Sequence, residues 1–282
     1  MDLSEAVERY VASRRWARGT VRGATHTFTH FVRATGDPLV AELTSEHVEA
    51  WWATQGKVAP STARGRHSQV SNLFRWCRHA GLLEGDPMAT IARPREPRRH
   101  PVTLSEDEVR RLMMVVPDER AALIVHLMLG LGLRCIDVHR LELADVDLVD
   151  RTLSVTGKGG HVDMLPLPDQ LVRTLGRYLR QYPATAGPLV RAYDAPVRAV
   201  SAQRISEMMA AWLREAGVKQ GRWDGRGAHA LRRTCATELL FAGVNVRSVQ
   251  AVLRHQSLAS TQRYVRRSDV EELRVAVERE FC

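Results

Sequence analysis

The chain has 282 residues, of which 44% are hydrophobic, and a length of this order suits two domains with separate cores. No stretch approaches eighteen uninterrupted apolar residues, and the N-terminus lacks the basic start of a secretory signal, which excludes a membrane span and a signal peptide. The net charge of +9 favours a polyanionic partner, most simply nucleic acid, over a basic protein that has no such partner.

The first part of the chain contains four amphipathic segments. Apolar residues at helical spacing predict helices over residues 2–14, 20–35, 45–55 and 60–79. Thr20 is expected to cap the second helix, and Gly81 follows the fourth. Short helices of this kind make a small bundle, in which Trp51, Trp52 and Trp76 are expected to be core residues rather than base-stacking groups.

Basic residues gather at the start of the fourth predicted helix. Lys57, Arg64 and Arg66, with His67, lie at that end. We interpret it as a DNA-facing surface, and the alternative is an ordinary solvated face.

A basic, proline-rich segment follows the bundle. The sequence "RPREPRRHP" at residues 93–101 contains three prolines, and neither a helix nor a strand tolerates that spacing. Its arginines suit a strap along a phosphate backbone. The predicted organisation is therefore an N-terminal domain at 1–93, a linker at 94–101 and a second domain at 102–282.

The second domain combines helices with a hairpin. Ser105 and Glu108 form a capping box at the start of a helix. Residues 120–131 are strongly apolar and predict a buried helix. Residues 152–167 alternate as a β-hairpin, with "GKGG" as its turn. Further helices are expected at 169–181 and 201–217.

Several side chains of this half can bind or transfer a phosphoryl group. Arg134 follows two glycines in apolar company and needs a partner, which Asp137 can supply. His229 and Arg232 share one face of a helix, and a guanidinium can grip two phosphate oxygens. Tyr264 is a weak nucleophile until cations and a base surround it. A surface Arg134–Asp137 pair and a solvated helical face are the alternatives.

The second domain therefore contains six candidate catalytic residues: Arg134, Lys158, His229, Arg232, His255 and Tyr264. Such a set fits phosphoryl transfer to tyrosine, because clamping and positioning carry most of that catalysis. Lys158, on the hairpin turn, can protonate a leaving oxygen.

The cysteines show no metal-binding pattern. Cys77, Cys135, Cys235 and Cys282 lack CxxC or zinc spacing, and we predict neither a metal nor a cofactor. The first three are expected to be buried free thiols, and a reducing cytoplasm is the simplest compartment.

Four segments resemble, in order, the signature segments of tyrosine recombinases, the phage integrase and Xer group. They are "LGLRCIDVHRLELADVDL", "TGKGGHVDMLPL", "HALRRTCATELLFAGVNVRSVQAVLRHQS" and "STQRYVRRS". The resemblance covers residues 102–267 and extends more weakly to 1–93. It implies a mainly α fold, with a four-helix, SAM-like core-binding domain and a mixed α+β catalytic domain that carries a small sheet or hairpin.

The resemblance also implies roles. Arg134 and Arg232 would clamp the scissile phosphate, Lys158 would be the general acid, and His229 and His255 would hydrogen-bond the phosphate.

By the same resemblance, Tyr264 would be the nucleophile and Asp137 would brace the first arginine. One departure is Arg254, in "LRH", where the family commonly has glycine. This departure puts the local turn and the aim of His255 in doubt.

The implied activity is site-specific DNA recombination through a 3′-phosphotyrosyl intermediate, either for integration and excision of a mobile element or for resolution of DNA multimers. The implied partners are double-stranded recombination sites, a homotetramer in which the tail helix at 269–281 packs on a neighbour, and an accessory DNA-bending factor. No arm-site domain is expected before the core-binding helices. The alternatives are a non-catalytic DNA-binding protein on this fold and a type IB topoisomerase-like nicking-closing enzyme.

Overall fold

A computed structural model describes residues 1–56, 58–95, 102–157, 160–195, 197–221 and 224–254. The chain divides into two compact units, Met1–Arg99 (unit 1) and His100–Cys282 (unit 2). The mainly helical fold with a small antiparallel sheet, predicted from the sequence, is confirmed.

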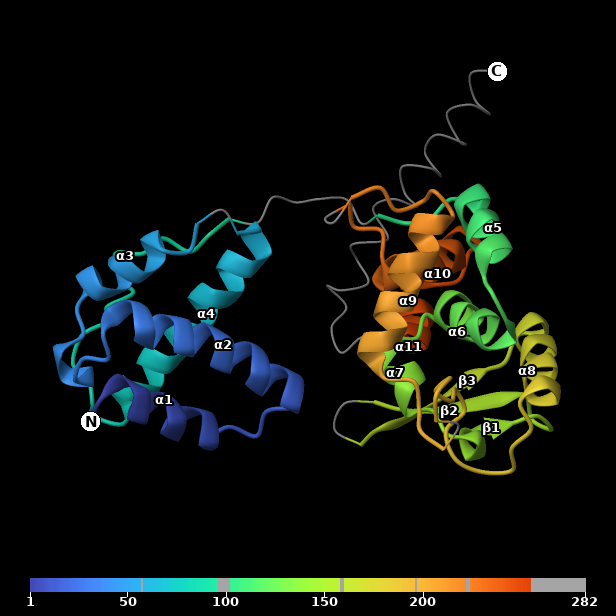
Figure 1. The fold of residues 1–282 in the computed structure, drawn as a ribbon, viewed down its shortest axis with the longest axis horizontal. Helices are drawn as coiled ribbons and strands as arrows, with labels where there is room; N and C mark the ends of the chain where they lie inside the picture. Colours follow the sequence, from blue (N-terminus) through green and yellow to red (C-terminus); the bar gives the residue numbers. More distant parts are fainter. Residues whose placement is uncertain (57, 96–101, 158–159, 196, 222–223, 255–282) are drawn as a thin grey trace, which may run out of the picture. The chain divides into compact units, whose positions relative to one another are not determined.

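Unit 1 is a helical bundle (Figure 1). Its elements are α1 (Leu3–Ala12), α2 (Arg18–Thr35), the short 3-10 helix η1 (Val40–Glu42), α3 (Ser45–Ala53) and α4 (Pro60–His79). The predicted start of α2 at Thr20 is wrong: the helix begins at Arg18, and the residue before it, Ala17, has no side chain that could cap it. Gly36 closes α2 in a left-handed conformation with φ 76°, which suits glycine because it has no Cβ.

Aromatic side chains fill the core of unit 1. Tyr10, Phe28, Phe31, Trp51 and Phe74 are fully buried or nearly so. Phe31 and Trp51 meet edge to face with ring centroids 5.0 Å apart, the arrangement that the ring quadrupoles favour. As expected, the three tryptophans belong to the core: Trp51 lies inside it, and Trp52 and Trp76 pack against it.

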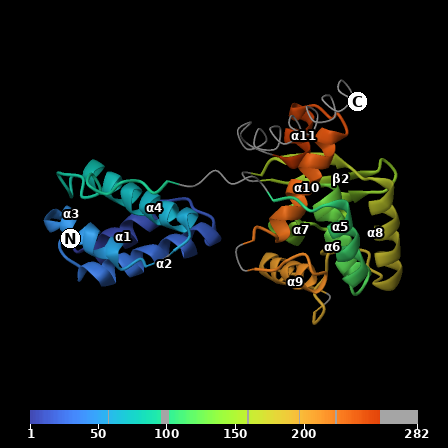
Figure 2. The same ribbon diagram turned by 90° about the horizontal axis from the view of Figure 1, so that it is seen from above.

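Unit 2 is built around one buried helix (Figures 1 and 2). Its elements are α5 (Glu106–Val115), α6 (Glu119–Gly130), α7 (Cys135–Arg140), the 3-10 helix η2 (Leu143–Asp145), β1 (Val146–Asp147), β2 (Thr152–Thr156), β3 (Val162–Pro166), α8 (Asp169–Gln181), α9 (Ala202–Glu215), α10 (Ala228–Phe241) and α11 (Val246–Leu253). Helix α6 is apolar on nearly every side and packs against both α8 and α10. A helix that is hydrophobic all round must be covered in this way.

The sheet is antiparallel, with strand order β1–β2–β3. Leu153 pairs with Leu165 and Val155 pairs with Asp163. Leu153 and Val155 are buried on one face, and their neighbours along β2 are more exposed. The predicted hairpin is confirmed, and the structure adds the two-residue strand β1 beside it.

In the described part of the chain, no helix is both long and apolar enough to cross a membrane.

Candidate active site

Gly132 brings the segment before α7 against α11. Its φ is +60°, and a Cβ placed there would lie 2.5 Å from Leu253 Cδ2 and 3.5 Å from Cys235 Sγ. Both neighbours are buried. Glycine is therefore required at this position by its backbone conformation as well as by the close approach.

Arg134 stands at the N-terminal end of α7, where Asp137 holds it. Asp137 Oδ2 accepts a hydrogen bond from the Arg134 backbone N–H at 2.9 Å and lies 3.7 Å from Arg134 Nη1. Asp137 is 7% exposed, whereas the Arg134 side chain is 36% exposed. The expected pair is present. Because its acid is buried, it is not an ordinary surface ion pair.

Arg232 comes from α10 and ties three segments together. It is 4% exposed. Nη1 donates to the carbonyl of Gly132, and Nη2 donates to the carbonyl of Leu253, the last residue of α11. A guanidinium carries five N–H groups in a fixed fork, and two of them make these bonds. The side chain thus fixes the turn before Arg134 and the end of α11 to one helix.

His229 lies one helical turn before Arg232, on the surface of unit 2. Desolvation of the ring by neighbouring groups, and then the positive charges of Arg233, Arg232 and Arg134, lower the pKa of His229 below its usual value. The imidazole therefore stays neutral to lower pH than a free histidine. The structure brings Arg134, His229 and Arg232 together from two helices that are far apart in the sequence.

Arg254 stands in the sequence where glycine is common in the family that the chain resembles. It caps α11 in the left-handed conformation, with φ 51° and ψ 50°, so the helix ends as it would with a glycine. Its Nη2 forms an ion pair with Asp137 Oδ2. No sequence pattern predicted this contact, because the two residues are 117 positions apart.

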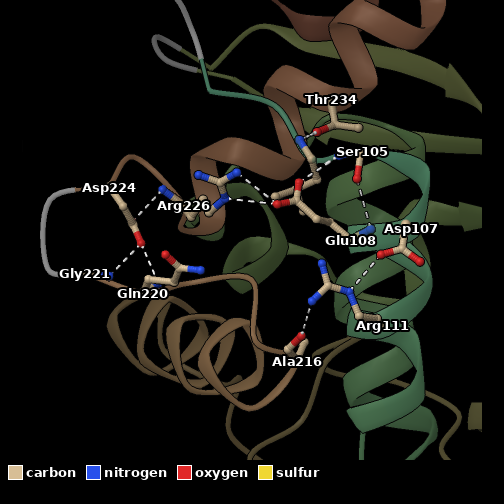
Figure 3. A network of polar contacts seen from close by, with 11 residues as sticks. Ser105, Asp107, Glu108, Arg111, Ala216, Gln220, Gly221, Asp224, Arg226 and Thr234 are labelled. Atoms are coloured by element: carbon tan, nitrogen blue, oxygen red, sulfur yellow. Dashed lines mark hydrogen bonds and ion pairs between the residues drawn. The ribbon is translucent and has the colours of Figure 1, made fainter.

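A carboxylate organises the loop that leads into α10 (Figure 3). Asp224 accepts hydrogen bonds from the backbone N–H groups of Gln220, Gly221 and Arg226 at 2.8–2.9 Å. It also accepts one from Lys219 Nζ at 2.8 Å. Burial alone would raise the pKa of Asp224, but these donors outweigh burial and hold the pKa well below its usual range. These bonds tie residues 219–221 to Asp224 and Arg226, which lead into α10.

The same network joins α5 to this loop (Figure 3). Arg226 donates to Glu108 Oε1 through Nη2 at 2.9 Å and Nε at 3.2 Å. Glu108 also completes the predicted capping box, accepting from the Ser105 backbone N–H at 2.9 Å. Thr234 of α10 accepts from the Leu104 backbone N–H at 2.8 Å. The start of unit 2 is thus bonded to the helix that carries His229 and Arg232.

The thiols of the described residues are not activated. Burial raises the pKa of Cys235 to about 12 and that of Cys77 to about 11. Cys135 is only partly buried, contrary to expectation, because it begins α7 at the surface beside Arg134; burial still raises its pKa. A cysteine nucleophile has no support here, since the thiolate is the reactive form.

Four predicted residues and the tail lie outside the described residues: Lys57, Lys158, His255, Tyr264 and 269–281. The two remaining basic candidates, Arg64 and Arg66, lie near the start of α4 and are half-buried. Arg66 Nη1 donates to Gln55 Oε1. Among the described residues, no group of three or more His, Cys, Asp and Glu side chains could hold a metal ion.

Comparison with known proteins places this geometry in context. A model of the phage integrase family matches residues 102–271. The chain is 30% identical over 231 residues to the tyrosine recombinase XerD of Xanthomonas campestris pv. campestris, covering 76% of this chain and 70% of that protein.

Solved structures show the same fold at lower identity. A lambda integrase dimer (residues 75–356) bound to a COC′ core site matches with a TM-score of 0.76 and 19% identity, covering 94% of this chain and 95% of that chain. A lambda integrase tetramer bound to a Holliday junction matches with a TM-score of 0.75 and 20% identity, covering 91% and 78%.

Proposed function

Because the chain belongs to the phage integrase family and is a site-specific tyrosine recombinase, we propose that it cleaves and rejoins DNA through a 3′-phosphotyrosyl intermediate at Tyr264. The observation that carries the proposal is the gathering of Arg134, His229 and Arg232, braced by Asp137. Two guanidinium groups and a neutral imidazole suit a phosphodiester, whose transition state concentrates negative charge on its non-bridging oxygens.

The steps balance without a metal or a nucleotide. The Tyr264 hydroxyl gives its proton to the neutral imidazole proposed for this role, His229, as its oxygen attacks the scissile phosphorus, and the bond from phosphorus to the 5′-oxygen breaks. Lys158 protonates that oxygen as it leaves. The phosphotyrosyl ester preserves the diester, so a 5′-hydroxyl from a partner strand attacks it, releases the tyrosine and reseals the DNA.

The neutral state of His229 suits a supporting role. A neutral imidazole has one donor and one acceptor nitrogen. It can donate to a phosphate oxygen and, unlike the arginines, accept a proton at neutral pH. His255 is likewise proposed to hydrogen-bond the phosphate and to assist proton transfer, as the family resemblance implies.

We assign DNA binding to both parts of the chain. Residues 1–93 are proposed to be the core-binding domain, 94–101 the basic linker and 102–282 the catalytic domain. Lys57, Arg64 and Arg66 are the proposed DNA contacts of the first domain. The net charge of +9 supports a polyanionic partner for the chain as a whole.

Recombination requires two duplexes to be held together. We propose a homotetramer on DNA, with the tail at 269–281 packed on a neighbour; the lambda integrase tetramer on a Holliday junction supports this assembly by analogy of fold. The biological outcome is either integration and excision of a mobile element or resolution of DNA multimers.

The test is covalent trapping on DNA. The protein first selects its core site from a pool of random duplexes, and that site is then nicked beside the cleavage position so that the short cleaved strand diffuses away. The wild-type chain should accumulate a covalent protein–DNA adduct, and Tyr264→Phe should form none while retaining its affinity for the site. An adduct in Tyr264→Phe would remove Tyr264 as the nucleophile. A wild-type chain that binds the site without forming an adduct would favour a non-catalytic DNA-binding protein.

A further inference from the structure

Arg254 occupies a backbone conformation that does not favour it. With φ at 51° it lies in the left-handed region, one of three non-glycine residues of the described chain to have a positive φ. Such a conformation crowds the Cβ of any L-residue against the backbone. A glycine would end α11 without that crowding, so the shape of the turn alone does not account for an arginine.

The Arg254 side chain is also not fully satisfied by hydrogen bonds. It is 5% exposed, and its Nε and Nη1 are buried without a hydrogen-bond partner in the described part of the chain. Buried donors without acceptors oppose folding. Among the described residues, the strong contact of this guanidinium is the ion pair from Nη2 to Asp137 Oδ2.

That contact falls on the oxygen that braces Arg134. Asp137 Oδ2 receives the backbone N–H of Arg134 at 2.9 Å, and Arg134 Nη1 stands 3.7 Å away. The distance to Nη1 exceeds that of a hydrogen bond, whereas the contact with Arg254 is a close one. One buried carboxylate thus faces two guanidinium groups, and it is bound more tightly to Arg254.

We infer that Arg254 is a positioning residue that acts through Asp137, an inference that rests on the proposed function of the site. By neutralising Asp137, Arg254 keeps that carboxylate from drawing in the Arg134 guanidinium. The Arg134 guanidinium, which is always charged, then keeps its donors and its orientation available for the scissile phosphate. Without Arg254, Asp137 and Arg134 form a closed pair, and the phosphate must compete with the carboxylate for the same donors.

The test compares variants on the nicked core site at saturating DNA. Arg254→Gly, which suits the left-handed turn, should slow adduct formation by roughly 10- to 100-fold, the scale of a misplaced catalytic group. Its affinity for the site should stay within about twofold and its melting temperature should not fall. Arg254→Lys, which keeps the charge but loses the planar fork, should recover part of the rate.

Asp137→Asn provides the second arm. If Arg254 acts through Asp137, adding Arg254→Gly to Asp137→Asn should change the rate by less than about twofold, because coupled residues are not additive. The inference would be overturned if Arg254→Gly cleaved DNA at the wild-type rate. It would also be overturned if Arg254→Gly lowered the rate equally in the wild-type chain and in Asp137→Asn. A salt dependence of DNA binding that is weaker by about one charge in Arg254→Gly would also overturn it, because that result would indicate a direct contact between Arg254 and a phosphate.

Binding of orthovanadate tests the role of Arg254 independently of DNA cleavage, and so independently of the proposed function. The anion is titrated into the DNA-free protein and followed by thermal shift, which requires no cleavage. Arg254→Gly should bind orthovanadate several-fold more weakly than wild type, and equal binding would count against Arg254. Absence of an adduct in the wild-type chain contradicts the proposed function alone.

Discussion

Units 1 and 2 bury different kinds of side chain. In the described part of unit 1, Thr27 is the one polar residue that is buried, and aromatic rings fill the core. Unit 2 buries Asp137 and three arginines, Arg120, Arg191 and Arg232. An apolar core tolerates any hydrophobic set of suitable volume, whereas a buried charge requires particular partners.

The buried arginines of unit 2 each have such partners. Arg120 lies between the rings of Tyr182 and Tyr193, 4.4 and 3.9 Å from their centroids, and Arg191 donates to the carbonyls of Tyr182 and Pro183. These two stabilise the region between α6 and α8, away from the candidate site. The abundance of arginine therefore does not by itself identify DNA contacts, because some of the arginines stabilise the fold of unit 2.

The largest effect is expected for Gly132→Ala, which tests whether unit 2 depends on particular close contacts. The left-handed φ and the 2.5 Å approach to buried Leu253 should together lower the free energy of unfolding of unit 2 by about 3 kcal/mol. Displacement of the Gly132 carbonyl from Arg232 should slow adduct formation by about 100-fold. Urea unfolding and the nicked-site assay measure the two effects.

Gly130→Ala is the matched control. It lies two residues away at the end of α6, and a Cβ there would meet nothing within 4 Å. Its stability should be unchanged or slightly higher, since alanine favours a helix over glycine. Equal losses in the two variants would show that close approach at Gly132 is not the cause.

A smaller effect is expected at Asp224, whose charged hydrogen bonds should stabilise unit 2 without taking part in cleavage. Asp224→Asn should destabilise unit 2 by about 2 kcal/mol at pH 7, because charge-assisted hydrogen bonds are lost. The pKa of Asp224 is lower in the folded than in the unfolded chain. The unfolded chain therefore takes up its proton first on acidification, and the stabilisation is present above about pH 4 and lost below it.

Urea unfolding at pH 7 and pH 3.5 tests both points, and the gap between wild type and Asp224→Asn should narrow at the lower pH. Asp107→Asn is the control, since its carboxylate is 61% exposed and pairs with Arg111 at the surface. It should change stability by less than about 0.5 kcal/mol. A gap that is constant with pH would contradict the role of the Asp224 charge.

The smallest effect is expected in unit 1, where basic residues lie at the surface of an apolar bundle. Arg66→Ala should weaken binding of the core site several-fold and reduce its salt dependence by about one charge, without slowing cleavage at saturating DNA. Arg9→Ala is the control, because Arg9 is exposed on α1 and pairs with Glu5 at 2.7 Å. Equal affinities for the two variants would remove Arg66 from the DNA contacts.

The sequence predicts what depends on spacing within one element. The helices, the hairpin and the Ser105–Glu108 capping box follow from local periodicity and side-chain chemistry, and all are present. The bond between Arg134 and Asp137 also follows, because the two are three residues apart on α7. The start of α2 could not be predicted in this way, because the residue before the helix, Ala17, has no side chain that could cap it. Strand β1, with two residues, is too short for an alternating pattern.

What the sequence does not predict depends on contacts between distant elements. The carbonyl partners of Arg232 and the ion pair between Arg254 and Asp137 join residues 21 to 117 positions apart. Hydrophobic patterns fix which face of a helix is buried, but not which donor meets which acceptor across the core. The glycine-rich approach to Arg134 was visible in the sequence, whereas its cause, the proximity of Leu253, was not.

The bond from Arg232 to the Leu253 carbonyl also fixes the point from which the proposed nucleophile is tethered. Tyr264 follows Leu253 by eleven positions in the sequence, and a polypeptide spans at most about 3.6 Å per residue. Whatever path the chain takes, Tyr264 therefore stays within a sphere of about 40 Å radius. Its centre is pinned beside the arginine that is proposed to clamp the phosphate. Loss of the bond between Arg232 and the Leu253 carbonyl would move the centre of this sphere, although the eleven positions from Leu253 to Tyr264 would span the same maximum distance.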